Sequence, residues 1–376
     1  MKITEIRTTP LLVPYKKPYY WAQGTIDGAY VILVEVLTDQ GITGYGECIG
    51  TPTATGIQAF IAEAAKFIVG HDPFRNAHLM ATAYHALFQE RGTCSSPRFA
   101  GQVLAGVEMA LWDIMGKAAG RAVHELLGGA VHDEICYFGF PQGETPEEIA
   151  AEARIIANQG CKIIYVKVGK DDATDLAIVR QVREAIGPDR RLRIDPNEQW
   201  GPLTAARMIP RIAEYGIEFV EQPTDCESLS ALAQVRANSS IAIAADQRVF
   251  TPHDAFDVCK AQAADLIVLG LHETGGINRF IKAGRIAEAA GINICAHGLY
   301  ETGITTCATH QAAAVLPNLD DGNQYMNHFL EWDIIDSPDL TLKSGKLPVL
   351  GGPGLGFELN PDAVARAREL HKQQEV

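Results

Sequence analysis

Three short apolar runs in the middle of the chain each end in a carboxylate. They are residues 193–195, 219–221 and 243–246, and the carboxylates of Asp195, Glu221 and Asp246 are 26 (195 to 221) and 25 (221 to 246) residues apart. One strand–helix repeat of a β/α barrel takes about 25–35 residues, because roughly 250 residues close eight repeats. Carboxylates in phase with that repeat would meet at the C-terminal ends of adjacent parallel strands, where such barrels keep their active sites.

Converging carboxylates repel one another strongly unless a cation lies between them. Hard oxygen ligands in a small set suit Mg²⁺, with Mn²⁺ as the alternative, and they leave coordination positions for substrate oxygens and water. We therefore expect Asp195, Glu221 and Asp246 to bind a divalent metal. Asn197, two residues after Asp195, would point to the same side and is a candidate for substrate binding. No cysteine or histidine cluster competes as a zinc site.

A tyrosine and a lysine lie at the end of another predicted strand, residues 163–167. Alternation along a strand places Tyr165 and Lys167 on one face, and we expect this face to point into the barrel. Burial beside a dication would lower the pKa of Lys167 towards neutrality, which would make it a general base. The alternative is a lysine that only pairs with a metal-ligating carboxylate.

His297 ends the predicted strand 293–297, across the barrel from Lys167. The two side chains could therefore face opposite sides of a substrate held on the metal, although a histidine at a strand end is often structural. Glu301 and Glu331 lie near the ends of the last two predicted barrel strands. Each is a candidate for a hydrogen bond to a substrate carboxylate or its enolate, and a surface or salt-bridge position is the alternative.

The positions of these side chains depend on a regular alternation of predicted strands and helices that begins near residue 133. Seven or eight such units indicate a parallel α/β sheet closed into a barrel. An open, doubly wound sheet is the alternative, but no glycine-rich nucleotide-binding motif follows the first strands. The predicted strands are 135–138, 163–167, 192–195, 219–221, 241–246, 266–269 and 293–297. The segment 324–332 is a candidate for the eighth strand and its loop.

The first 130 residues have a different pattern, with three predicted strands followed by helices, and form an α+β unit. Within it, the segment 16–24 combines aromatic and basic residues with chain breakers, so we expect a loop. This loop either lies on the surface or closes on a ligand as a flap. In the second case Tyr19 and Trp21 would contact the substrate, together with Thr51 after the third strand.

Composition narrows the class of protein. The chain has 376 residues, a net charge of −14 and a pI of about 5.2, which argues against nucleic acid or an anionic membrane as the main partner. No apolar run approaches about 18 residues, and the N-terminus is not a signal peptide. Eight scattered cysteines without a CxxC pair are typical of free thiols in a reducing compartment. We expect a cytoplasmic enzyme.

With these residues assigned, the chain resembles the enolase superfamily, in its mandelate racemase and muconate-lactonizing branch. The resemblance covers nearly the whole chain, and its combination of motifs is specific for the fold and the metal. Besides the three carboxylate strands, the matching segments are 44–48, 110–117, 126–129 and 353–356.

The resemblance implies a (β/α)7β TIM-like barrel over residues 131–350. It also implies an N-terminal α+β capping domain over residues 1–130, completed by a C-terminal segment, 351–376, that returns to the cap. Further implications are Mg²⁺ on the three carboxylates, a small carboxylate substrate and a homo-oligomer.

Two positions depart from the pattern of the family. The second strand usually reads Lys-x-Lys, whereas here Tyr165 precedes Lys167, so the usual base is kept beside a phenol that could tune it, bind substrate or donate a proton. On the sixth strand the usual lysine or aspartate is replaced by Gly270. The seventh-strand histidine therefore lacks its usual carboxylate partner, for which His272 or Glu273 could compensate.

The shared first step of the family is removal of the proton α to a carboxylate, with the metal stabilising the enediolate. The leading hypothesis is a lyase that dehydrates a hydroxy-acid such as an acid sugar. Lys167 would take the α-proton, and His297 or Tyr165 would protonate the departing hydroxyl. The second hypothesis is a racemase, epimerase or cycloisomerase. A third, motivated by Gly270, is a non-catalytic ligand-binding protein.

Overall fold

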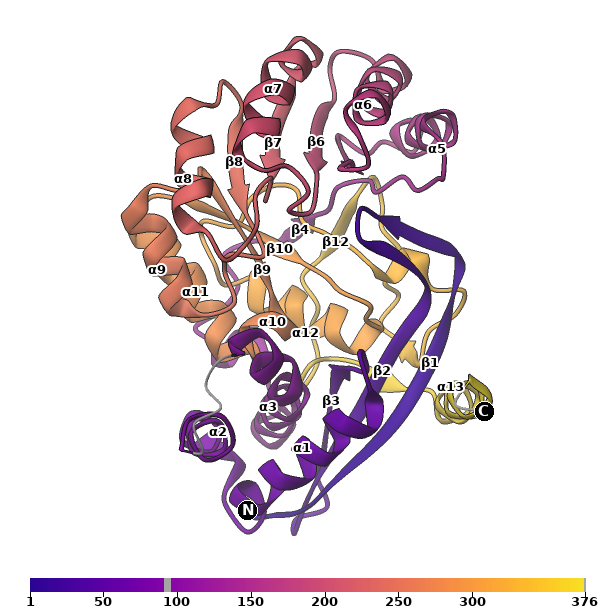
Figure 1. Cartoon of the computed structure of the whole chain (residues 1–376). Coiled ribbons are helices and arrows are strands. Elements are labelled where there is room, and N and C mark those ends of the chain that lie inside the picture. Colours follow the sequence, from indigo (N-terminus) through magenta and orange to yellow (C-terminus); the bar gives the residue numbers. More distant parts are fainter. Residues whose placement is uncertain (91–95, 375–376) are drawn as a thin grey trace.

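The computed structural model of the chain describes residues 1–90 and 96–374 and is shown in Figure 1. An antiparallel sheet in the order β1-β2-β3 opens the chain. Helix α3 (Pro97–Ala119) packs against it, and its residues from Val103 to Ile114 are continuously buried, most of them apolar. The other strands and helices of this part are β1 (Ile3–Trp21), β2 (Gly24–Thr38), β3 (Thr43–Ile49), α1 (Ala54–Ile68), η1 (Pro73–Arg75), α2 (Asn76–Tyr84), the π-helix His85–Gln89 and α4 (Val123–Leu126).

Two glycines of β3 allow α3 to approach the sheet closely. An added Cβ would lie 2.1 Å from the Ala110 carbonyl oxygen at Gly44 and 1.9 Å from the Gly106 carbonyl oxygen at Gly46. No real Cβ fits at such distances, so the backbone of α3 lies directly on β3. The close contact positions Glu47, the next residue of β3, deep inside the molecule, where its side chain is fully buried.

The predicted loop at residues 16–24 is wrong. β1 continues through Trp21, and β2 begins at Gly24, so only residues 22–23 form the turn of a long hairpin. Tyr19 pairs with Ile26 and Trp21 with Gly24, after a register shift that begins at Pro14. Aromatic residues pair well across strands, and here that preference outweighs the chain breakers nearby. We call residues 15–27 the hairpin arm.

A parallel sheet of six strands, in the order β10-β9-β8-β7-β6-β5, forms the second part of the molecule. Its strands are β5 (Ile163–Lys167), β6 (Arg191–Asp195), β7 (Ile217–Glu221), β8 (Ala242–Ala245), β9 (Leu266–Gly270) and β10 (Asn293–His297). The helices between and after them are α5 (Pro146–Asn158), which precedes β5, α6 (Asp172–Ile186), α7 (Pro202–Ile212), η3 (Ala213–Tyr215), α8 (Leu229–Asn238), α9 (Pro252–Ala261), α10 (Leu271–Thr274), α11 (Ile277–Ala289) and α12 (Gly303–Ala313). The predicted parallel α/β sheet is confirmed.

The two edges of this sheet are joined by single bridges rather than by long strands. Gly139 bridges to Ile164 of β5, Tyr137 bridges to Asn323, and Leu319 bridges to Ile294 of β10, all in parallel. The predicted strand 135–138 is only partly correct, because β4 (Glu134–Cys136) pairs antiparallel with β12 (Lys346–Pro348). The exact (β/α)7β count stays a prediction.

After Asn323 the chain is irregular. The segment predicted as the eighth strand and its loop contains the 3-10 helix η4 (Asn327–Phe329), and it is followed by β11 (Ile335–Ser337), β12 and β13 (Glu358–Leu359). The last helix, α13 (Pro361–Gln374), lies against β1 (Figure 1). The Tyr30 hydroxyl of β2 donates to Gln374 Oε1 at 2.7 Å, so the chain end returns to the first sheet. The domain boundaries themselves stay predictions.

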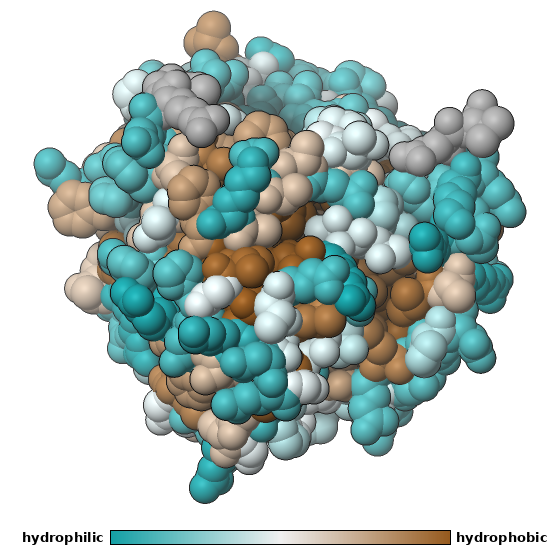
Figure 2. Space-filling view, turned by 90° about the horizontal axis from the view of Figure 1, so that it is seen from below, coloured by the Kyte–Doolittle hydropathy of each residue, from teal (hydrophilic) through white to brown (hydrophobic). Residues whose placement is uncertain are grey.

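The surface and the cysteines bear on the remaining expectations. Figure 2 shows apolar residues gathered near the middle of the face seen from below, with polar residues around them. Such a region is typical of a surface that contacts another chain, and the homo-oligomer stays a prediction. None of the described helices is long and apolar enough to cross a membrane. The seven described cysteines are free thiols, and Cys94 lies outside the described residues.

Candidate active site

The predicted chemical residues meet at the C-terminal edge of the parallel sheet. Asp195 ends β6, Glu221 ends β7, and Asp246 directly follows β8. Lys167 and His297 end β5 and β10, the two outer strands of the sheet. All three carboxylates are almost completely buried, as the apolar strands leading to them require.

Lys167 and Tyr165 contact the carboxylates of the two neighbouring strands. Lys167 Nζ donates to Asp195 Oδ2 at 2.5 Å, because Lys167 and Asp195 are direct partners in the β5–β6 ladder. The Tyr165 hydroxyl lies 2.6 Å from Asp195 Oδ2 and 2.9 Å from Glu221 Oε1, and Lys167 Nζ lies 3.2 Å from the same hydroxyl. The alternation of β5 therefore brings both predicted residues to the site, with the phenol between two carboxylates.

The site carries more negative than positive charge. Burial, together with Asp195 and Asp246, raises the pKa of Glu221 well above its usual range, and burial raises the pKa of Asp246 to about 7. Burial alone would lower the pKa of Lys167, but the Asp195 and Glu221 carboxylates outweigh it and raise that pKa. The predicted lowering of the Lys167 pKa therefore depends on a cation that offsets these carboxylates.

The donor set suits a hard divalent cation. Asp246 Oδ2 is buried and has no hydrogen-bond partner in the described chain. A buried carboxylate oxygen without a hydrogen-bond partner destabilises the folded protein unless a cation binds it. Asp195, Glu221 and Asp246 offer only oxygen atoms, which favours Mg²⁺ or Mn²⁺ over softer metals.

Among residues 1–90 and 96–374, two groups of three side chains bring potential metal-ligating atoms close together. Atoms of Asp246, Glu273 and His297 lie within 4.8 Å of one another, and so do those of Glu198, Asp225 and Cys226. The first group shares Asp246 with the predicted metal set. The second group is partly exposed, and exposed acidic groups are common without a metal.

His297 has a carboxylate partner after all. Its Nδ1 lies 3.0 Å from Glu273 Oε2 and 3.5 Å from Asp246 Oδ1. Burial alone would lower the pKa of His297, but Asp246 and Glu273 outweigh it and raise this pKa to about 9. The other oxygen of Glu273 pairs with Arg98 Nη2 of α3 at 2.8 Å. The predicted gap beside the histidine is therefore filled by an ion pair that reaches from α3 to β10.

Gly270 is the reason that Glu273 fits there. Gly270 is the direct neighbour of His297 in the β9–β10 ladder, and an added Cβ would lie 2.4 Å from Glu273 Oε2. Glu273 comes from the one-turn helix α10, which starts at the next residue and folds back over the strand end. His272 is not the partner, because its Nε2 bonds to Thr305 Oγ1 at 2.9 Å and burial lowers its pKa to about 3.

The predicted substrate-binding residues differ in where they lie. The Asn197 N–H donates to Asp195 Oδ1 at 2.6 Å, and its side-chain oxygen is buried without a partner in the described chain. Glu301 is buried after β10, where burial raises its pKa to about 8. Glu331 is exposed, and no hydrogen bond or ion pair joins its side chain to the carboxylates in the described chain.

The hairpin arm brings two further predicted residues towards Lys167. The rings of Tyr19 and Trp21 are 5.6 Å apart, and Trp21 lies 5.8 Å from the ring of Tyr300. Tyr19 also contacts Phe140 at 5.5 Å, and Phe140 lies 5.7 Å from Lys167 Nζ. These rings form an apolar wall beside the lysine. Thr51 is partly exposed after β3 and makes no hydrogen bond to this group among the described residues.

Three residues near the site were not singled out by the sequence pattern. Arg98 lies in α3, Tyr300 follows β10, and Phe140 precedes α5. No spacing in the sequence links them to the carboxylates. Tyr300 could have been found from its place three residues after His297, because residues after barrel strands often line the site.

Comparison with known proteins places both parts of the chain. Residues 3–128 match the mandelate racemase / muconate lactonizing enzyme N-terminal domain, and residues 148–363 match the enolase C-terminal domain-like model. The chain is 32% identical over 360 residues to the L-Ala-D/L-Glu epimerase of Bacillus subtilis, covering 95% of this chain and 97% of that protein. It is also 32% identical over 370 residues to muconate cycloisomerase 1 of Rhodococcus opacus, covering 97% and 98%.

Solved structures agree with these matches. A 2-chloromuconate cycloisomerase from Rhodococcus opacus superposes with a TM-score of 0.90 at 26% identity, covering 98% of this chain and 99% of that chain. A dipeptide epimerase from Enterococcus faecalis, complexed with Mg and the dipeptide L-Leu-L-Tyr, gives a TM-score of 0.87 at 28% identity, covering 95% and 100%. The chain belongs to the mandelate racemase and muconate-lactonizing enzyme family of the enolase superfamily.

Proposed function

We propose that the chain is a metal-dependent isomerase that removes the proton α to the carboxylate of a small substrate. The observation that carries this proposal is the pair of proton-transfer groups at opposite edges of one buried carboxylate row. Lys167 ends β5 and His297 ends β10, and each is hydrogen-bonded to a carboxylate. Relatives of the chain are epimerases and cycloisomerases, which supports isomerisation as the reaction type.

Asp195, Glu221 and Asp246 would hold Mg²⁺, with Mn²⁺ as the alternative. The ion supplies positive charge that offsets the negative charge developing on the substrate carboxylate. The solved structure of a dipeptide epimerase with Mg supports this choice of metal. Asn197 and Glu301, both buried beside the row, are the proposed hydrogen-bonding groups for the substrate.

Lys167 is the proposed base. It must be neutral to accept a proton, and the Asp195 carboxylate now favours its charged form. A cation on the carboxylates would offset that field and bring the lysine closer to neutrality. Tyr165, whose hydroxyl lies between Asp195, Glu221 and Lys167, is proposed to orient the amine.

His297 is the proposed partner on the other side of the substrate. Glu273 holds its Nδ1, so Nε2 is the nitrogen that remains for proton transfer. In epimerisation or cycloisomerisation, His297 would exchange a proton with the face opposite Lys167. In dehydration, the second candidate reaction, a protonated His297 would donate to the departing β-hydroxyl, and its raised pKa favours that protonated form.

The substrate is proposed to be a small carboxylate that meets the aromatic wall of Tyr19, Trp21 and Tyr300. The known relatives act on amino-acid dipeptides, muconates and a sugar lactone, as their names state. An apolar wall favours substrates with an apolar part, so dipeptides and muconate-like acids come before acid sugars.

The test is a screen of dipeptides, N-acyl amino acids, unsaturated diacids and acid sugars with Mg²⁺ in D₂O. Mass spectrometry and NMR read deuterium at the α-carbon, the appearance of an isomer, and loss of water. The expected result is α-deuterium with isomer formation for the wild type, and no isomer and no α-exchange on the Lys167 face for Lys167→Ala. Water loss giving a 2-keto acid would instead support dehydration.

A wild type that binds carboxylates without exchange or turnover across the screen would overturn the proposal. Lys167→Ala binding the same ligands equally well would then favour the non-catalytic alternative. His297→Asn separates the two proton-transfer groups, because it should keep α-exchange in one configuration and lose product.

A further inference from the structure

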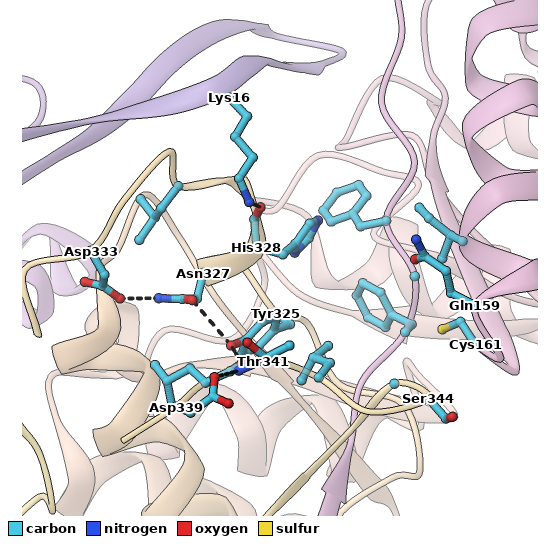
Figure 3. Close-up of a pocket in the computed structure, with 18 of the residues that line it drawn as sticks. Lys16, Gln159, Cys161, Tyr325, Asn327, His328, Asp333, Asp339, Thr341 and Ser344 are labelled. Atoms are coloured by element: carbon cyan, nitrogen blue, oxygen red, sulfur yellow. Dashed lines mark hydrogen bonds between the residues drawn. The ribbon is translucent and has the colours of Figure 1, made fainter. Parts of the chain in front are cut away.

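A cavity of about 610 Å³ is lined largely by residues 325–345, where the regular pattern of strands and helices ends (Figure 3). One side is formed by α5 and the chain around Phe138 and Cys161, and the other side by residues 325–345. From Asn323 to Leu359 the described chain contains only η4 and short strands, with no α-helix against this part of the sheet. An irregular segment packs less closely than a helix, and the cavity is what remains.

This cavity is separate from the candidate active site. None of Lys167, Asp195, Glu221, Asp246 or His297 lines it. A volume of several hundred Å³ is the size of small-molecule sites in proteins, which lie at about 300–1,000 Å³.

The floor of the cavity is apolar and part of its rim is acidic. Figure 3 shows Asp333 and Asp339 on one side and Gln159 and Cys161 across from them. Asp333 is committed to its own chain, because it accepts from the N–H groups of Gly303 and Ile334 and from Asn327. The apolar lining residues include Phe138, Phe140, Leu330, Trp332, Leu340 and Leu342.

Two carboxylates at the rim can take a ligand charge. Asp336 and Asp339 are exposed, and Asp336 accepts a hydrogen bond from the Asn360 side chain and Asp339 from the Thr341 N–H. Lys16 is the positive residue of the lining, and its Nζ donates to the His328 carbonyl oxygen at 2.9 Å. The balance of three lining aspartates against one lysine favours a cation over an anion.

The lining also contains a donor that lacks an acceptor. The indole N–H of Trp332 is buried and has no partner in the described parts of the chain. A buried donor of this kind costs free energy until an acceptor reaches it. A ligand atom or a water molecule in the cavity would supply one.

We propose that this cavity is a second ligand site that binds a small amine with an aromatic or aliphatic body. The body would fill the apolar floor, and the ammonium group would lie at the rim beside Asp336 and Asp339. The site requires no turnover at the carboxylate row, so the inference stands independently of the proposed function.

The wall between this cavity and the catalytic pair is thin. Phe138 and Phe140 line the cavity, and their rings lie 4.5 Å and 5.0 Å from the ring of Tyr165. A ligand body on the apolar floor would therefore contact the rings that pack against Tyr165. Lys16 adds a second connection, because it belongs to the hairpin arm, which also carries Tyr19 and Trp21.

Isothermal titration calorimetry with phenethylamine tests the site, and phenylacetate is the probe of matched size and opposite charge. The full-length wild type should bind phenethylamine saturably and phenylacetate at least tenfold more weakly. The double variant Asp336→Asn/Asp339→Asn should bind phenethylamine about tenfold more weakly, since asparagine keeps an acceptor but loses the charge. Asp189→Asn, an exposed position that does not line the cavity, should bind as the wild type does.

Two further variants locate the bound probe. Leu342→Trp fills the cavity and should abolish binding, with a thermal melt confirming that the variant is folded. Lys167→Ala changes the candidate active site and should leave phenethylamine binding unchanged. Absence of saturable binding, equal binding of phenylacetate, or loss of binding in Lys167→Ala with retention in Leu342→Trp would each overturn the proposal.

Discussion

The absence of a side chain at Gly270 decides which carboxylate serves His297. The space that an aspartate or lysine would take on β9 is occupied by the carboxylate of Glu273, 2.4 Å from where a Cβ would lie. The same carboxylate is held by Arg98. The acid has therefore moved three residues along the chain, from the strand end to the helix turn after it.

We predict that Gly270→Ala lowers kcat by about 10- to 100-fold and leaves the melting temperature nearly unchanged. The added methyl group must displace the Glu273 carboxylate from His297, and misplacing a catalytic group by about 1 Å can cost on the order of a hundredfold in rate. Steady-state kinetics on the substrate found by screening would measure the loss. Gly201→Ala is the matched control, because nothing lies within 4 Å of its added Cβ, and wild-type kcat in Gly270→Ala would contradict the role of Glu273.

The sequence predicted single residues best where one strand end follows another at a constant interval. Asp195, Glu221 and Asp246 were found from their spacing, and Lys167 from alternation along its strand. Glu273 could be proposed only as one of two candidates, because the four residues of α10 decide whether it or His272 faces His297. Arg98 reaches the site from a distant helix, and no local pattern predicts that contact.

Among the elements, the hairpin arm is the one that differs most from expectation. Its residues include one proline, two lysines and a glycine that favour a loop, but cross-strand pairing of Tyr19, Tyr20 and Trp21 extends both strands to the turn. Because side chains alternate between the two faces of a strand, Tyr20 points to the opposite face from Tyr19 and Trp21. Tyr20 bonds outward to Glu144, whereas Tyr19 and Trp21 lie with Tyr300.

We predict that Trp21→Ala raises KM by about tenfold with little change in kcat. The ring contributes apolar contact to the wall beside Lys167, and a partly buried aromatic ring contributes about 1–3 kcal/mol to such contacts. Steady-state kinetics would separate the two constants. Tyr20→Ala, from the opposite face of the same strand, should leave KM unchanged, and equal effects of both substitutions would count against the wall as a substrate contact.

A buried carboxylate joins β3 to the start of α12. Glu47 accepts hydrogen bonds from the Thr302 N–H at 3.0 Å and from the Thr305 hydroxyl at 2.7 Å, and it also contacts the Thr302 hydroxyl. Burial raises the pKa of Glu47 to about 7, against an ordinary value of 4.5. The folded protein therefore holds a proton that the unfolded chain releases between these two pH values.

We predict that this carboxylate makes stability fall as pH rises from about 4.5 to about 7. The sign follows because the folded state binds the extra proton. The stabilisation from this proton is fully present below the pKa of Glu47 in the unfolded chain, and it is lost as the pH rises through the pKa of Glu47 in the folded protein. The total is on the order of 3 kcal/mol. Urea unfolding across this range would show Glu47→Gln gaining stability relative to the wild type with rising pH, because glutamine stays neutral. A constant difference between the two proteins would argue against the titration.

On the scale of the whole molecule, the first α+β unit and the parallel sheet are joined through buried charges. Arg98 of α3 reaches Glu273, Glu108 of α3 accepts from the N–H groups of Ile277 and Asn278, and Glu47 of β3 accepts from the N–H of Thr302 at the start of α12. Local periodicity predicted both units, as strands followed by helices in the first and as alternating strands and helices in the second. It could not predict these contacts, because each joins residues more than 160 positions apart.

From the carboxylate row we expect the stability of the molecule to depend on cations. A buried group with this excess of negative charge destabilises the folded state until a cation binds, so Mg²⁺ should stabilise the folded protein by mass action. We predict that Mg²⁺ at about 100 times its Kd raises the melting temperature of chelator-treated protein by about 3–5 °C. Binding at this concentration of Mg²⁺ stabilises the folded state by about 2.7 kcal/mol. Differential scanning calorimetry measures the shift.

Two substitutions test whether the stabilising Mg²⁺ binds at the carboxylate row. Asp246→Asn should lose the Mg²⁺ shift. Without metal it should melt no lower than the wild type, because the substitution removes a carboxyl group whose charged form is disfavoured by burial, as its pKa of about 7 indicates. Asp225→Asn, in the partly exposed group with Glu198 and Cys226, should keep the full shift. The reverse result, a shift lost in Asp225→Asn and kept in Asp246→Asn, would move the cation away from the strand ends and remove the basis for Lys167 as the base.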